Sequence, residues 1–328
     1  MELYPLLFES NLHSVVWGGN KLTAWKRLPA EEKPIGESWE VSAVPSSINI
    51  IANGALKGKD LVSVIAAHPV EILGKKVAEA NNNQLPLLVK FIDAQRDLSI
   101  QVHPNDEMAK RVENKLGKTE MWYIIDAQPG AYLYSGLKQN ITPEEYKRRI
   151  ADGTICDVLA KHEVKAGDVF YIPAGRVHAI CSGILLAEVQ QSSDVTYRIF
   201  DYNRPGMDGK PRELHTEKAA EALDYHVADN YRTEYSYQQD AANMIIDSDY
   251  FKVRVVDTHH AAESNLLSQD SFVIAMCLKG DCRIKVKATG EEVVLREGFS
   301  TLIPAAIADY EIIPDNSASY SQVLEAYL

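Results

Sequence analysis

The chain has 328 residues, of which 46% are apolar and 24% charged, so it is long enough for one large domain or two and has the composition of a soluble globular protein. Its formal net charge of -12 argues against a nucleic-acid-binding protein, because phosphate backbones are bound by clustered lysine and arginine side chains. No apolar run approaches the roughly 18 residues of a membrane-spanning helix, so no membrane association is expected.

The N-terminal segment and the cysteines indicate a cytoplasmic protein. The apolar run from Tyr4 to Phe8 is short and follows no basic segment, so it does not resemble a signal peptide. The four cysteines form no CxxC pair and have no regular spacing, which indicates neither a disulfide framework nor a thiolate zinc site. They are Cys156, Cys181, Cys277 and Cys282. We therefore expect a reduced chain in the cytoplasm, and nothing indicates an obligate protein partner.

Four segments have helical periodicity, and most of the remaining chain has the pattern of short β-strands. Helices are expected over about 59–80, just after Asn105, over 142–151 and over 213–223. Thr142, followed by a proline and by Glu145 three residues on, forms a capping box at the start of the third helix. The β-like runs include ILLAEVQ, FKVRVVD, SFVIAMCLKG and CRIKVKATGEEVVLREG. This order of elements predicts an all-β sandwich or barrel with added helices.

Two stretches of the chain resemble each other. GDVFYIPAGRVHAI, which begins at Gly167, aligns with GFSTLIPAAIADYEI, which begins at Gly298, so that both contain a Gly-x5-Pro segment. Upstream, EMWYIIDAQPGA aligns with DSFVIAMCLKGD, which leaves extra residues in the first copy around the third helix. Two related barrels, the first with a helical insertion, would explain this repeat. Because His178 aligns with Asp309, the second barrel would lack whatever His178 does.

Residues 98–106, LSIQVHPND, form a predicted strand with polar side chains at alternate positions. Side chains two residues apart in a strand share a face, so Gln101 and His103 are expected to lie together, opposite Ile100 and Val102. Pro104 restricts His103 to extended backbone angles, which helps to fix the direction of its side chain. A face of this kind is either solvent-exposed or functional.

Several motifs resemble those of one enzyme family. GDVFYIPAGRVHAI has the form Gly-x5-Pro-x-Gly-x2-His, which closely resembles the second metal motif of the cupin superfamily. Together with LSIQVHPND and GKTEMWYII, it strongly resembles the zinc-dependent type I phosphomannose isomerases. The resemblance extends, in chain order, to VWGGNKL, GESWEVSA, LPLLVKFIDA and EVQQSSDVTYRIFDYNR. It implies an aldose–ketose isomerase of the short bacterial form, which interconverts mannose 6-phosphate and fructose 6-phosphate through an enediolate.

The resemblance implies a mainly β fold with two cupin-like (jelly-roll) barrels. We expect residues 1–240 to form an N-terminal barrel with helical insertions and the catalytic site. Residues 241–328 are expected to form a second cupin-like barrel that lacks the metal ligands.

A metal site with one zinc ion per chain is also implied by the resemblance. The four expected ligands are one amide oxygen, two imidazoles and one carboxylate, from Gln101, His103, Glu120 and His178. Imidazole and carboxylate donors suit zinc, whereas an amide oxygen is a less common ligand of that ion. With one anionic ligand, a dication keeps a formal charge of about +1 and remains an effective Lewis acid.

Arg198, Glu188 and Lys118 are the catalytic residues that the resemblance implies. The guanidinium of Arg198 could bind phosphate or stabilise the enediolate, and Lys118 could anchor phosphate or shuttle a proton. Glu188 is the leading candidate for the general base, while Asp194 could orient Arg198 or serve as the base instead. The substrate-binding set that we expect consists of Ser99, Lys118, Asp194, Arg198 and Trp17.

Two other functions fit parts of the sequence. A non-catalytic sugar-phosphate-binding regulator would keep the pocket but lose a metal ligand or Arg198, and neither is lost here. A cupin oxygenase that uses iron or manganese usually has His-x-His early in the barrel, where this chain has Gln-x-His. The sequence therefore favours a small sugar phosphate as the binding partner.

Overall fold

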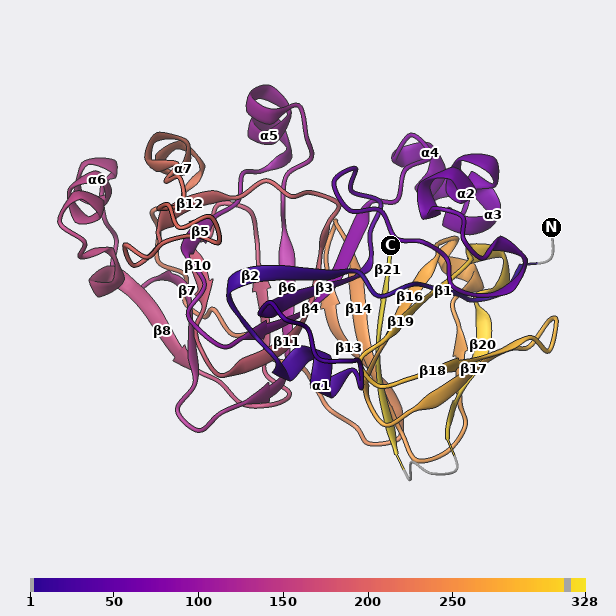
Figure 1. The fold of residues 1–328 in the computed structure, drawn as a ribbon. Helices are drawn as coiled ribbons and strands as arrows, with labels where there is room; N and C mark the ends of the chain where they lie inside the picture. Colours follow the sequence, from indigo (N-terminus) through magenta and orange to yellow (C-terminus); the bar gives the residue numbers. More distant parts are fainter. Residues whose placement is uncertain (1–2, 316–319) are drawn as a thin grey trace.

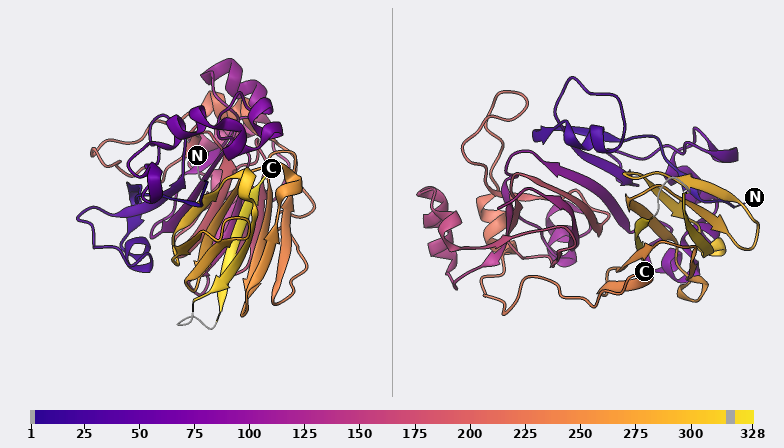
Figure 2. Two further views of the ribbon diagram at one scale, coloured as in Figure 1. Left: turned by 90° about the vertical axis from the view of Figure 1, so that its right-hand side faces the viewer. Right: turned by 90° about the horizontal axis from the view of Figure 1, so that it is seen from below.

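Two β-sandwiches make up most of the structure, which is a computed structural model describing residues 3–315 and 320–328. Figure 1 shows them side by side, with most of the helices along the upper edge of the molecule, and the right-hand view of Figure 2 shows the same two bodies from below. The expected mainly β fold is confirmed. Within the described residues, no helix is long and apolar enough to cross a membrane.

The first sandwich consists of two antiparallel sheets that face each other. The larger sheet has the strand order β2 (Leu12–Gly19), β3 (Ile35–Val41), β4 (Leu87–Ala94), β11 (Ile184–Gln191), β6 (Glu120–Ala127) and β9 (Val169–Ile172). The facing sheet has the order β12 (Tyr197–Phe200), β5 (Ile100–Val102), β10 (His178–Ile180), β7 (Tyr132–Leu137) and β8 (Leu159–Glu163). Strands far apart in the chain are thus neighbours, as in a jelly roll.

The second sandwich repeats this plan with residues from both ends of the chain. Its larger sheet has the order β1 (Leu6–Leu7), β19 (Ser300–Ile303), β16 (Val273–Lys279), β21 (Ser321–Tyr327), β14 (Lys252–Thr258) and β13 (Ala241–Asp247). Its smaller sheet has the order β15 (Ala262–Asn265), β20 (Asp309–Pro314), β17 (Cys282–Val286) and β18 (Glu292–Leu295). The N-terminal strand β1 therefore pairs with a strand of the C-terminal sandwich.

The helices are short and lie in the connections between strands. They are α1 (Lys21–Trp25), α2 (Leu61–Ala67), α3 (Pro69–Leu73), α4 (Lys75–Ala80), α5 (Asp106–Glu113), α6 (Pro143–Ala151) and α7 (Thr216–Ala222). Single 3-10 turns lie at η1 (Gly54–Leu56), η2 (Ile155–Val158), η3 (Leu267–Gln269) and η4 (Ala305–Ile307). The predicted cap of α6 is confirmed, because Thr142 Oγ1 accepts a hydrogen bond from the backbone N–H of Glu145 at 3.2 Å.

The segment expected to be one helix over 59–80 forms the three helices α2, α3 and α4. Pro69 starts α3, because proline fits the first turn of a helix and not its interior. Gly74 ends α3 with φ +88° and lies against the backbone of Asp270, where a Cβ atom would come within 2.0 Å of the carbonyl oxygen. A glycine is required at that contact.

The two sandwiches share a continuous apolar interface. The outer faces of the two larger sheets contribute to one buried cluster, which includes Val89 and Ala187 from the first sandwich and Val255 and Leu324 from the second. The residues that follow α1 add polar contacts across this interface. Lys26, which is fully buried, donates to Glu40 Oε1 at 2.5 Å and to the carbonyl of Gly298.

The register of the strands tests the internal repeat. β9 and β19 begin two residues after Gly167 and Gly298, as the Gly-x5-Pro alignment predicts. In the first sandwich Glu120 pairs with Ile172, and in the second Val273 pairs with Ile303. Val273 is therefore the structural counterpart of Glu120. The sequence alignment had paired Glu120 with Asp270, which is three residues earlier. The difference arises because β6 is one residue longer than β16, and Gly130 is the third residue after β6 whereas Gly280 directly follows β16.

Candidate metal centre and active site

Three buried side chains in the first sandwich form a group that can hold a metal ion. The ligand atoms of His103, Glu120 and His178 all lie within 4.8 Å of one another. His103 Nε2 is 3.3 Å from Glu120 Oε2, and His178 Nε2 is 3.4 Å from Glu120 Oε1. His103 directly follows β5, Glu120 begins β6 and His178 begins β10, so the facing sheets bring together residues that are distant in the sequence.

Both imidazoles direct Nε2 to the centre of this group as an acceptor nitrogen. His103 Nδ1 lies 2.9 Å from the carbonyl of Val195, and His178 Nδ1 lies 2.8 Å from the carbonyl of Arg176. A proton on each Nδ1 satisfies these carbonyls and leaves each Nε2 as an acceptor. Burial and then Lys118 lower the pKa of His103 to about 3, and burial also lowers the pKa of His178. Both rings are therefore neutral, as ligation requires.

The Glu120 carboxylate is the anionic member of the group. Burial by itself would raise the pKa of Glu120, but Lys118 and the two imidazoles hold it well below its usual range. Both carboxylate oxygens are buried; within the described part of the chain Oε1 has no hydrogen-bond partner, and Oε2 forms an ion pair with Lys118 at 2.8 Å. Buried polar atoms are normally satisfied, so the unpartnered Oε1 fits a cation placed between this carboxylate and the imidazoles.

Gln101 and Lys118 border the same group. Gln101 pairs with His178 across β5 and β10, and its Nε2 atom is 3.3 Å from His178 Nε2. A half-turn of the amide would bring Oε1 to that position, where it could act as a ligand. Lys118 Nζ lies 2.8 Å from Glu120 Oε2 and 3.1 Å from His103 Nε2. The fold thus brings together the four ligands and the lysine that were expected from the sequence.

A second buried group lies on the larger sheet of the same sandwich. Lys90 Nζ is 3.2 Å from Glu188 Oε1 and 3.6 Å from Glu37 Oε2. Burial opposes the charge of Lys90, yet the two carboxylates raise its pKa, and Lys90 in turn lowers the pKa of Glu37 against its burial. Burial and then the charge of Glu120 raise the pKa of Glu188.

Lys90 and Glu37 were not identified from the sequence. A signal was present, because Lys90 is the only charged residue in the apolar run Leu85–Ile92, and a lysine at the centre of a buried strand requires a charge partner. Trp122 connects this group to the metal ligands. Its indole N–H donates to Glu188 Oε2 at 2.9 Å, and its ring meets the His178 ring edge-on at 5.3 Å.

Arg198 lies on β12, which pairs with β5. It pairs with Gln101 in register, donates through Nη1 to the carbonyl of Glu213 at 2.9 Å, and has a buried Nε without a hydrogen-bond partner among the described residues. Burial and then the charge of Arg212 lower its pKa. Asp201 pairs with the neighbouring arginines Arg204 and Arg212, and among residues 3–315 and 320–328 Arg198 forms no ion pair, so it can accept an anionic ligand.

The remaining predicted residues differ in their surroundings. Ser99 is buried immediately before β5. Trp17 on β2 is buried in the same apolar cluster as Ile92 and Trp122, which fits a packing role. Asp194 does not pair with Arg198; its Oδ1 lies 2.5 Å from Lys115 Nζ.

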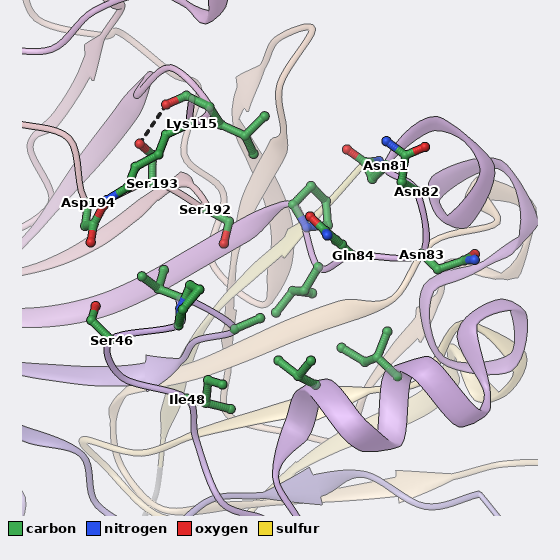
Figure 3. A pocket seen from close by; sticks show the side chains of 18 of the residues that line it. Ser46, Ile48, Asn81, Asn82, Asn83, Gln84, Lys115, Ser192, Ser193 and Asp194 are labelled. Atoms are coloured by element: carbon green, nitrogen blue, oxygen red, sulfur yellow. Dashed lines mark hydrogen bonds and ion pairs between the residues drawn. The ribbon is translucent and has the colours of Figure 1, made fainter. Parts of the chain in front are cut away.

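Asp194 also lines a large open pocket of about 1080 Å³ outside the metal group. Figure 3 shows Ser192, Ser193 and Asp194 on one side of this pocket and Asn81–Gln84 across from them. His103, Glu120 and His178 do not line it. This pocket is therefore separate from the group of candidate ligands.

Comparison with known proteins identifies the relatives of this chain. The family description "Phosphomannose isomerase type I, catalytic domain" matches residues 6–134, and "Mannose-6-phosphate isomerase, cupin domain" matches residues 241–315. The chain is 37% identical to the probable mannose-6-phosphate isomerase GmuF of Bacillus subtilis, over 94% of this chain and 96% of the relative. It is 34% identical to the mannose-6-phosphate isomerase of Streptococcus mutans, over 95% of this chain and 98% of the relative.

A solved structure has the same fold over the full length. The crystal structure of the mannose 6-phosphate isomerase from Bacillus subtilis matches with a TM-score of 0.88 and 30% identity, and covers 99% of each chain. The two-sandwich arrangement and the connections between its strands are therefore common to both proteins.

Proposed function

Because this chain belongs to the type I phosphomannose isomerase family, we propose that it interconverts mannose 6-phosphate and fructose 6-phosphate at the His103–Glu120–His178 group. The observation that carries this proposal is the buried group itself: two neutral imidazoles and a carboxylate whose ligand atoms all lie within 4.8 Å of one another. A non-catalytic regulator would have lost a metal ligand or Arg198, whereas this chain keeps all four candidate ligands and Arg198.

Zinc is the metal that we propose for this site, with one ion per chain. His103, Glu120 and His178 would hold it, with Gln101 as the fourth protein ligand. Two imidazole nitrogens and a carboxylate are donors that zinc prefers. The bound ion supplies positive charge that stabilises a developing oxyanion on the sugar.

We assign the proton transfer to Glu188. Its carboxylate takes the proton from C2 of open-chain mannose 6-phosphate, the C2–H electron pair forms the C1=C2 double bond, and the aldehyde π pair moves to O1. Glu188 then returns its proton to C1. The C2 hydroxyl loses its proton as the C2=O bond forms, and O1 gains one, so that atoms and charge balance. Lys118 exchanges this hydroxyl proton between O2 and O1.

Support for Glu188 over Asp194 comes from their surroundings. Glu188 is buried, has a raised pKa and contacts Trp122, which touches the ligand His178. Asp194 is paired with Lys115 at the border of a separate pocket. Arg198 anchors the phosphate, because a guanidinium without a carboxylate partner can form two parallel hydrogen bonds to an oxyanion.

Metal analysis combined with an isomerase assay tests the proposal. The protein as purified should contain one zinc per chain, should lose turnover on chelation and should recover it when zinc is restored. His178→Ala should lower kcat by about 1000-fold or more, since it removes a ligand. His226→Ala changes an exposed histidine in the segment that follows α7 and should keep full activity. Full activity in metal-free protein would contradict the proposal.

A further inference from the structure

We propose that Trp122 is a positioning residue for the reaction, which holds Glu188 Oε2 and so leaves Oε1 available to the substrate. This inference depends on the proposed role of Glu188 as the base. Glutamate carboxylates rotate readily about their last torsion angle, which has broad minima. A base that must reach two adjacent carbons in turn needs that rotation to be restricted.

The contacts of Glu188 show how the restriction arises. Trp122 and Glu188 are direct cross-strand neighbours on β6 and β11, and the indole N–H donates to Oε2 at 2.9 Å. Both side chains are buried, at 0% and 3% exposure, so no water competes for this bond. Lys90 Nζ lies 3.2 Å from Oε1 as an ion pair, and no second group in 3–315 or 320–328 contacts that oxygen through a hydrogen bond.

The second sandwich contains the same ion pair without the tryptophan. Glu325 pairs in register with Arg254 and Ala275, as Glu188 pairs with Lys90 and Trp122. A buried carboxylate paired with a cation on the neighbouring strand is therefore common to both sandwiches. Since the second sandwich has Val273 where the first has the ligand Glu120, this ion pair does not by itself indicate catalysis.

The hydrogen bonds to the two carboxylates differ. Glu325 Oε1 accepts from Ser264 at 2.8 Å and from Tyr310 at 2.5 Å, and Arg254 binds Oε2, so both oxygens are occupied. Glu188 receives its hydrogen bond from Trp122 on one oxygen only. Among the described residues, Glu188 therefore has no donor from the facing sheet, and its Oε1 carries only the ion pair with Lys90 at 3.2 Å.

Trp122→Phe removes the N–H and keeps an aromatic ring against His178. We expect kcat to fall 10- to 30-fold with KM changed less than twofold and with one metal per chain retained. The primary isotope effect with mannose 6-phosphate deuterated at C2 should increase, because proton abstraction becomes slower. Replacement of Trp122 by benzothienylalanine, in which sulfur replaces the N–H at nearly constant shape, should give the same loss if the phenylalanine variant folds poorly.

Trp25→Phe is the matched control, because Trp25 Nε1 also donates to a carboxylate, Glu297, at 2.8 Å but lies at the interface between the sandwiches. It should keep wild-type kinetics. Wild-type kcat and isotope effect in both Trp122 variants, while Glu188→Gln is inactive, would overturn the positioning role alone. Wild-type turnover in Glu188→Gln would overturn the assignment of the base, and this inference with it.

Discussion

Glu120→Gln removes the one charged ligand of the candidate metal site while keeping its shape. In the wild type, Glu120 is fully buried within 3.4 Å of both imidazoles. Binding free energies for structural zinc are about 10–16 kcal/mol. Four ligands then contribute about 3 kcal/mol each, so loss of the carboxylate should weaken the affinity for zinc by about 100-fold.

Thermal unfolding with and without zinc measures this change. A ligand that binds the folded state stabilises it by RT ln(1 + [L]/Kd), which is about 4 kcal/mol at 1000 times Kd. At the same zinc concentration, a 100-fold weaker site would give only about 1.4 kcal/mol. The zinc-dependent increase in unfolding temperature should therefore shrink to about a third in Glu120→Gln.

Competition with a chromogenic chelator gives the zinc affinity directly. Glu163→Gln is the control, because Glu163 is an exposed carboxylate at the end of β8 in the same sandwich, and it should leave the affinity unchanged. If Glu120→Gln bound zinc within threefold of the wild type, Glu120 would not be a ligand, and the assignment of the site would be wrong.

Three further predictions concern other buried charges. Lys26→Met leaves the Glu40 carboxylate buried without its cation and should lower the free energy of unfolding by about 3–5 kcal/mol in urea titrations; a loss below about 1 kcal/mol would show that Lys26 is not required at the interface. Arg204 and Arg212 hold the pKa of Asp201 below its usual 3.8 against its burial, so Asp201 contributes stability above pH 4 that disappears as the pH falls through its lower folded pKa. The difference in unfolding free energy between the wild type and Asp201→Asn should accordingly be constant above about pH 5 and shrink below pH 4, and a difference that grew in acid would contradict this ion pair. Arg198→Lys should lower kcat/KM for mannose 6-phosphate by about 10- to 100-fold with the metal content unchanged, because an ammonium cannot bind an oxyanion through two parallel bonds; unchanged kcat/KM would exclude Arg198 as the phosphate anchor.

Local sequence rules identified much of the site. The alternation in LSIQVHPND placed Gln101 and His103 on one face, and the Gly-x5-Pro segment placed His178 at the start of the next strand. The cap at Thr142 located α6 to within one residue. These features depend on the geometry of one strand, one turn or one helix end, which neighbouring residues fix.

The contacts between residues that are distant in the chain could not be predicted from the sequence. Glu188 and Trp122 are 66 residues apart, and Lys26 and Gly298 are 272 residues apart. Which donor reaches which oxygen depends on the strand register across a whole sheet, and a shift of one residue would turn every side chain to the opposite face. The sequence by itself therefore determined most of the strands, the candidate ligands and the family. The tertiary structure decided which buried charges meet, because the free energy of a buried charge depends on partners that only the folded chain brings within a few ångströms.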